Sequence, residues 1–216
     1  MHDDAELIYI HDPMCSWCWG FRPTFESLCA QLPRGLGVRR LLGGLAADND
    51  QPMPAEMRAY LQATWRRIAE RIPGTRFNHA FWTECTPRRS TWPACRAVIV
   101  ARQLDPATET LMIDAIQRAY YLQARNPSEH ETLIELADAI GLDANAFQAQ
   151  LDAQVTRAVL DTEMAEARSM GADSFPSLRL RLADQYWPVP VDYTHCAPML
   201  AAIRERMAAT EPADER

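Results

Sequence analysis

Strand-like segments occur only near the two ends of this sequence, and that distribution constrains the fold more than any other feature. Short apolar runs at 7–10 and 38–42 are each followed by turn residues. From 177 to 182 leucine alternates with arginine, which predicts a strand with its leucines on one face and its arginines on a solvated face. The segment 186–191 can return beside it, and its two prolines place it at a sheet edge. One sheet is therefore assembled from both ends of the chain.

The residues between these strands show helical spacing instead. Met57, Leu61 and Trp65 fall on one face of an expected helix, and another is expected over 92–104. We therefore predict an α/β fold in which the sheet is interrupted by an all-helical insertion. The predicted boundaries are 1–48 for the first part of the sheet domain, 49–154 for the helical insertion domain and 155–216 for the second part.

Charge and composition exclude several classes of protein. The chain has 216 residues and a formal net charge of −7, which disfavours nucleic acid and anionic membrane surfaces as partners. All 22 of its basic residues are arginine, so Schiff-base chemistry on a lysine is excluded. The N-terminal residues lack the basic and apolar stretches of a secretion signal, and no apolar run is long enough to span a membrane. We expect a cytoplasmic protein.

A Cys-x-x-Cys motif follows the first strand and opens the first helix. Unpaired backbone N–H groups and the helix dipole at this position favour negative charge, and therefore the thiolate of Cys15. Cys18 lies almost one helical turn later, close enough to form a disulfide with Cys15 or to resolve a mixed disulfide. The dithiol Cys15-Ser16-Trp17-Cys18 is thus the candidate catalytic centre, with Cys15 attacking and Cys18 resolving.

A second motif, Ser174-Phe175-Pro176-Ser177, precedes the alternating strand. Because Pro176 has no N–H group, a cis peptide here would leave the backbone of Phe175 free to pair with an extended substrate. Phe175 and Pro176 are therefore candidate supports of the active site, together with Ser16 and Trp17 between the two cysteines.

These two motifs carry a resemblance to a known family. The segment 12–21, Asp-Pro-Met-Cys-Ser-Trp-Cys-Trp-Gly-Phe, resembles the active-site segment of the DsbA family of the thioredoxin superfamily, in particular its cytoplasmic FrnE-like branch. The stretch 171–178 resembles that family's cis-proline loop, and a thioredoxin-like fold with an inserted helical domain is the layout of the family. The resemblance implies that Cys15 is the nucleophile, Cys18 the resolving thiol and Pro176 the cis-proline that faces them.

The implied activity is thiol–disulfide exchange as a reductase or disulfide isomerase. Its partners would be protein or peptide thiols and disulfides, with glutathione as the candidate co-substrate and no resident cofactor. Ser16 and Trp17 stand where periplasmic DsbA carries proline and histidine, so the resemblance does not imply a strongly oxidising enzyme. The redox direction, the natural substrate and the oligomeric state do not follow from the sequence.

Three other readings remain open at this point. A glutathione-dependent transferase or isomerase of the kappa or hydroxychromene-carboxylate isomerase type shares the layout, although those relatives typically carry serine at the position of Cys15. A chaperone-like polypeptide binder would keep its activity without Cys15. A zinc site would need two more ligands, for which only His11, His195 and Cys196 are available, so we predict no metal.

The remaining aromatic and cysteine residues receive weaker interpretations. Trp17 is a candidate substrate contact beside the dithiol. Cys29 lies on the apolar face of the first helix and is read as a core residue, and Cys196 is read as structural. Cys85 and Cys95 flank a proline-containing loop, where they are either a second redox pair or two unrelated thiols.

Overall fold

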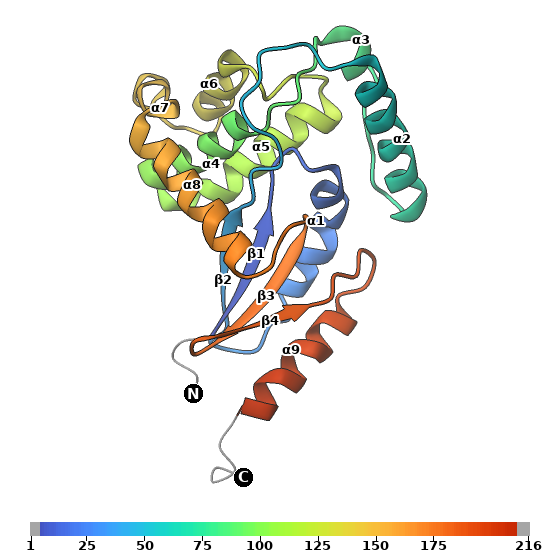
Figure 1. The fold of residues 1–216 in the computed structure, drawn as a ribbon, viewed down its shortest axis with the longest axis vertical. Helices are drawn as coiled ribbons and strands as arrows, with labels where there is room; N and C mark the ends of the chain where they lie inside the picture. Colours follow the sequence, from blue (N-terminus) through green and yellow to red (C-terminus); the bar gives the residue numbers. More distant parts are fainter. Residues whose placement is uncertain (1–4, 211–216) are drawn as a thin grey trace.

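Two strands from the beginning of the chain and two from its end form one sheet in the computed structural model, which describes residues 5–210. The strands are β1 (Glu6–His11), β2 (Gly37–Leu42), β3 (Ser177–Leu182) and β4 (Gln185–Val189). Their order is β2-β1-β3-β4, with β1 parallel to β2 and antiparallel to β3, and β4 antiparallel beside β3 (Figure 1). The sheet built from both ends of the chain is therefore confirmed, and the proline-containing last strand lies at an edge.

Helices fill the chain between β2 and β3 and flank the sheet. The helices of the described residues are α1 (Ser16–Cys29), α2 (Ala55–Arg71), α3 (Phe81–Glu84), α4 (Trp92–Leu104), α5 (Glu109–Leu122), α6 (His130–Ala139), α7 (Ala144–Leu151), α8 (Gln154–Ser169) and α9 (Ala197–Thr210), with a 3₁₀ turn at Pro106–Thr108. Helices α2 to α7 gather beyond the end of the sheet at which β1 and β2 finish (Figure 1). The segment that follows β1 therefore lies where the sheet meets the helical region.

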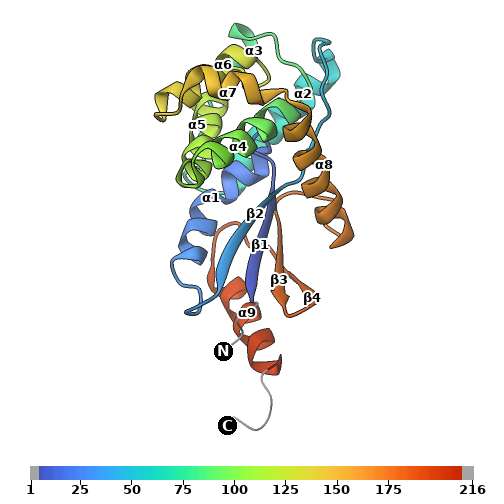
Figure 2. The ribbon, with the colours of Figure 1, turned by 90° about the vertical axis from the view of Figure 1, so that its left-hand side faces the viewer.

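The sheet is covered on both faces. Phe21 and Leu28 of α1 and Met199 of α9 pack with the strand leucines on one face. Ala167 of α8 packs with Ile8 on the other face, and Figure 2 shows α1 and α8 on opposite sides of the sheet. This is the thioredoxin-like α/β arrangement with a helical insertion that the sequence predicts.

The arginines of β3 are not simply solvated, contrary to the sequence interpretation. Arg179 donates through Nε to the carbonyl of Met170 at 2.9 Å and through a terminal nitrogen to that of Gly171 at 2.7 Å. These carbonyls end α8, whose last turn leaves carbonyl groups without helical partners. Arg181 forms an ion pair with Glu6 at 2.9 Å. The polar face of β3 thus holds α8 against the sheet.

The core of the helical region continues into the sheet. Trp65 of α2 is fully buried in the core of the helical region, and most side chains of α4 are buried there too. Leu42 at the end of β2 belongs to the same cluster, and Leu160 of α8 does too. Helix α8, which begins at the predicted boundary near residue 155, packs against both the helical core and the sheet, and the three domain ranges stay predictions.

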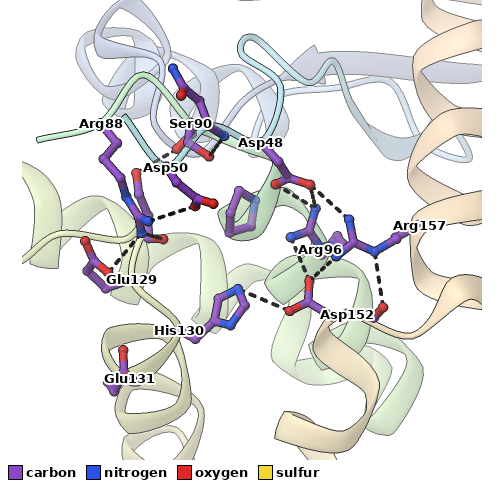
Figure 3. Close-up of a pocket in the computed structure, with 13 residues that line it drawn as sticks. Asp48, Asp50, Arg88, Ser90, Arg96, Glu129, His130, Glu131, Asp152 and Arg157 are labelled. Carbon is purple, nitrogen blue, oxygen red and sulfur yellow. Dashed lines mark hydrogen bonds and ion pairs between the residues drawn. The ribbon is translucent and has the colours of Figure 1, made fainter. Parts of the chain in front are cut away.

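A group of buried and half-buried charges, here named the paired cluster, joins the loop after β2 to α4, α7 and α8. Arg96 of α4 is only 2% exposed and pairs with Asp48 at 2.9 Å and Asp152 at 2.8 Å. Arg157 pairs with the same two carboxylates, each at 2.9 or 2.8 Å (Figure 3). Arg96 also donates to the carbonyl of Leu151 at 3.1 Å. These residues line a pocket of about 470 Å³ in which every arginine has carboxylate partners.

Candidate active site at the start of helix α1

Cys15 is the N-cap residue of α1, directly after the turn that follows β1. The turn is held by Asp12, whose carbonyl accepts from Cys15 N at 3.0 Å and whose carboxylate accepts from Met14 N at 2.8 Å. The dithiol therefore opens the first helix, as the sequence predicts.

The carboxylate of Asp12 does more than shape the turn. It is fully buried and accepts hydrogen bonds from Leu45 N at 2.8 Å and Thr91 Oγ1 at 2.6 Å. Burial raises its pKa, and the hydrogen bonds that it accepts oppose that rise. Asp12 thus ties the turn of the dithiol to the loop after β2 and to the start of α4. The sequence placed Asp12 at a strand end but carried no sign of these distant partners.

The structure brings the two motifs together. The thiol of Cys15 donates to the carbonyl oxygen of Phe175 at 3.5 Å, across 160 residues of sequence. The peptide bond between Phe175 and Pro176 is cis, and Pro176 is buried. Cys15 itself is buried, with 5% of its surface exposed.

Two glycines after β2 make room for the loop that carries Phe175. A Cβ added at Gly43 would lie 2.1 Å from the ring of Phe175, which no side chain tolerates. Gly44 has φ of +61°, and a Cβ there would lie 2.2 Å from Met164 Sδ. The glycine pair therefore lets Phe175 and helix α8 approach the end of β2 closely.

Cys18 differs from Cys15 in its surroundings. Its side chain is fully buried, and this burial raises its pKa well above the ordinary value, with a further rise from the neighbouring Cys15. A thiol held protonated is a poor nucleophile until a base or a neighbouring charge changes its state. This asymmetry fits Cys15 as the attacking thiol and Cys18 as the thiol that reacts second.

Ser16 and Trp17 separate the two cysteines. Ser16 is buried at the first helical position, whereas Trp17 is half-buried. The Trp17 ring lies 5.1 Å from the ring of Tyr193, and the guanidinium carbons of Arg67 and Arg71 lie 5.4 and 5.8 Å from its centre. These distances are within the range of cation–π attraction. Trp17 is thus covered in part by two arginines of α2.

No sequence motif distinguishes Arg67, Arg71 or Tyr193 as residues of the site. Arg67 and Arg71 are four residues apart on the exposed face of α2, a spacing that places both on one side of the helix. The sequence shows this spacing, but it does not show what the two arginines contact. Only the packing of α2 against α1 places both guanidinium groups beside Trp17.

The other cysteines lie apart from this site or are engaged elsewhere. All six cysteines are free thiols. Cys85 donates to the carbonyl of Ala124 at 3.0 Å, and the buried Cys95 donates to Asp12 at 3.5 Å, so these two thiols have different partners. Cys29 packs beside the core under α1, and Cys196 accepts from Gln31 at 3.2 Å.

Two further features are absent from the described residues. Within residues 5–210, no group of three or more histidine, cysteine or acidic side chains is arranged to hold a metal ion. No helix in the same range has the length and apolar character needed to cross a membrane.

Comparison with solved structures identifies the same architecture elsewhere. A protein from Nitrosomonas europaea, provisionally assigned as a protein disulfide isomerase, has a TM-score of 0.83 and 24% identity over 96% of this chain and 99% of that one. The cytosolic disulfide reductase DsbM from Pseudomonas aeruginosa has a TM-score of 0.76 and 26% identity over 95% and 100% of the two chains. DsbM is also known with GSH, in a structure with a TM-score of 0.73 and 27% identity that covers 94% and 99%.

Sequence comparison gives a family and a more distant group of relatives. The ClpXP adapter protein SpxH of Halalkalibacterium halodurans is 25% identical over 176 residues, which are 80% of this chain and 57% of SpxH. The chain therefore spans less than two thirds of the length of this curated relative. The family profile described as Thioredoxin matches residues 8–181, which include both motifs of the site. The chain therefore belongs to this thioredoxin family, whose structural relatives here are DsbA-like proteins.

Proposed function

We propose that this protein is a cytoplasmic thiol–disulfide oxidoreductase of the FrnE-like branch, which reduces or isomerises disulfides in proteins or peptides. The observation that carries the proposal is the contact between the Cys15 thiol and the Phe175 carbonyl, at the start of α1 and above a buried second thiol. A substrate cysteine that approaches Cys15 meets the backbone of the loop at the same point.

The reaction has two exchange steps. The Cys15 thiolate attacks one sulfur of the substrate disulfide, the S–S bond breaks, and the released sulfur leaves as a thiolate that takes up a proton. Cys18 then loses its proton and attacks Cys15 Sγ, which releases the second substrate sulfur and leaves a Cys15–Cys18 disulfide. The substrate has gained two electrons and two protons, and the enzyme has lost them.

The oxidised enzyme must then be reduced, and we propose glutathione as the reductant. Two glutathione molecules supply the two electrons and form glutathione disulfide in a further pair of exchanges. Support comes from DsbM, a cytosolic disulfide reductase that has been crystallised with GSH.

The decisive experiment is equilibration of the protein in glutathione buffers, with the redox state of Cys15 and Cys18 read by alkylation and mass spectrometry. We expect a two-electron couple at or below about −220 mV, near the glutathione poise of a cytosol. Cys15→Ser should show no such couple. A wild-type protein without a reversible couple would overturn the proposal, and a potential near −120 mV, about that of DsbA, would instead indicate an oxidant.

A second candidate function comes from the SpxH relatives, which are named as ClpXP adapters. An adapter binds a polypeptide without exchanging electrons, so its activity should survive Cys15→Ser. If Cys15→Ser retains its fold and loses the reduction of disulfides, the result supports catalysis. If it still binds a polypeptide as the wild type does and the wild type reduces no disulfide, the result supports adapter function.

A further inference from the structure

Several arginines near the dithiol lack carboxylate partners. Within the described residues, Arg67, Arg71, Arg76 and Arg118 form no ion pair and donate no side-chain hydrogen bond. All four are exposed. The chain as a whole has a net charge of −7, so these four arginines carry a sign of charge opposite to that of the whole molecule.

Three of these arginines line one cavity, here named the arginine groove. Arg71, Arg76 and Arg118 lie along it, and its volume is about 930 Å³. It runs between α1, the ends of α2 and α5, and the segment that carries Tyr193. Its size is within the range of sites that hold a ligand of several residues or a drug-sized molecule.

Two residues that line the arginine groove, Arg71 and Tyr193, also lie beside Trp17 of the dithiol motif. The guanidinium carbon of Arg71 lies 5.8 Å from the ring centre of Tyr193 and the same distance from that of Trp17. Thr24 Oγ1 donates to the carbonyl of Tyr193 at 2.7 Å, which holds this segment against α1. Since Trp17 lies between Cys15 and Cys18, a chain that leaves Cys15 along the groove passes the unpaired arginines.

The carboxylates of the groove are already engaged. Glu26 is the acidic residue that lines it, and it accepts from Arg22 Nε at 2.8 Å. Arg22 also pairs with Asp114. The groove therefore presents unpaired positive charge and no unpaired carboxylate, beside apolar surface from Trp19 and Ile72.

We infer that the arginine groove binds an acidic segment of the polypeptide whose disulfide is exchanged at Cys15. The inference rests on the proposed function and names its substrate class. Several separated guanidinium groups match a chain with carboxylates at successive positions better than they match a single small anion. The apolar surface beside them matches the side chains between those carboxylates.

The test compares three peptide disulfides that differ only in the residues flanking the cysteine, which are glutamate, lysine or uncharged. We measure kcat/KM for their reduction, with glutathione present, by the wild type and by the variant R67Q/R71Q. Exposed ion pairs contribute a few-fold each, so the wild type should prefer the acidic over the basic peptide by about tenfold. R67Q/R71Q should lose most of this preference, because its rate on the acidic peptide falls more than its rate on the uncharged peptide.

Arg66→Gln is the matched control. Arg66 lies on the same helix and is exposed, but it lines no part of the groove and contacts neither Trp17 nor Tyr193. It removes one charge, as Arg71→Gln alone does, and it should leave unchanged the preference that Arg71→Gln weakens. Equal loss in Arg66→Gln and Arg71→Gln would mean that only net charge matters, and would overturn the inference. Equal rates for the three peptides would overturn it as well.

A binding measurement separates this inference from the proposed function. A fluorescent acidic peptide with serine in place of cysteine is titrated with protein, and its anisotropy is followed at low and high salt. Binding that weakens at least fivefold in R67Q/R71Q supports the groove even if no disulfide is exchanged. If the peptide does not bind the wild type, or binds both proteins equally, the groove assignment is wrong, whereas the redox couple of Cys15 and Cys18 can still stand.

Discussion

Arg96 and Arg71 both belong to the helices inserted between β2 and β3, yet their surroundings are opposite. Arg96 belongs to the paired cluster, and its side chain is only 2% exposed. It pairs with the carboxylates of Asp48 and Asp152 and donates to the carbonyl of Leu151. Arg71 is exposed at the arginine groove and has only the faces of two aromatic rings beside it. A buried charge must be compensated within the fold, whereas an exposed one can remain available to a ligand. The comparison predicts that the first arginine supports stability and the second supports substrate choice.

The largest effect is expected from Arg96→Met. The substitution leaves Asp48 and Asp152 with one arginine between them, and removing one partner of a buried ion pair costs about 3–5 kcal/mol. Because the two carboxylates are 38% and 39% exposed, we expect about 3 kcal/mol from urea unfolding. Arg125→Met, which removes the exposed pair with Glu135, should cost under about 1 kcal/mol. Equal losses in the two variants would contradict the comparison.

His11 is a buried base without a counterion, unlike the paired Arg96. Its burial makes the free energy of unfolding depend on pH. It is 1% exposed, neither ring nitrogen has a hydrogen-bond partner, and burial lowers its pKa from 6.5 to about 3. The unfolded state therefore binds a proton that the folded state does not, between pH 6.5 and about 3. This contribution to stability is fully present above pH 6.5 and is lost as the pH falls toward 3, by about 1.4 kcal/mol per pH unit.

The check is His11→Phe, which keeps an aromatic ring against Tyr9. Urea unfolding at pH 7 and pH 5 should show that the wild type loses about 2 kcal/mol more than the variant. Identical losses would mean that His11 can take up a proton within the folded state.

Gly20→Ala should damage the arginine groove with a smaller cost in stability. A Cβ at Gly20 would lie 2.7 Å from Ile72 Cδ1 and 3.0 Å from Ile68 Cγ2, so the Ile72 side chain must move and the packing between α1 and α2 is disturbed. We expect a loss of about 1–2 kcal/mol in unfolding free energy, together with a weaker preference for acidic peptides. Wild-type preference in a destabilised variant would show that the groove does not depend on this close helix packing.

The smallest effect on stability is expected from Arg71→Gln. Arg71 is exposed and has no ion-pair partner among the described residues, so its unfolding free energy should stay within about 0.5 kcal/mol of the wild type. A loss above about 1.5 kcal/mol would identify Arg71 as a structural residue and remove the contrast with Arg96.

The sequence predicted the local elements well and the long-range contacts poorly. Helix α4 has the predicted bounds, and Asp143 caps α7 by accepting from Ala146 N at 2.8 Å, as its position suggests. Each of these features depends on residues within a few positions of one another. The four-residue helix α3 escaped prediction because it is too short to show a period.

For the site, the sequence identified the dithiol and the Phe175–Pro176 loop through motifs. It did not predict that Arg67 and Arg71 cover Trp17, or that Arg179 caps the end of α8. Those contacts depend on how helices pack across the fold, and an exposed arginine looks the same in sequence whether or not it has a partner. The roles of Cys15, Cys18, Ser16, Trp17, Phe175 and Pro176 in catalysis stay predictions.

The pairing of β1 with strands from both ends of the chain has a consequence for biosynthesis. Ile8 lies opposite Arg39 on one side and Arg179 on the other, so its second partner leaves the ribosome long after the first. Closing so long a loop makes this pairing a late, high-contact-order event. Cys15 and Cys18 are therefore translated well before the carbonyl that faces them. A nascent chain therefore carries both thiols before the Phe175 loop, which contacts Cys15 in the folded protein, has been made.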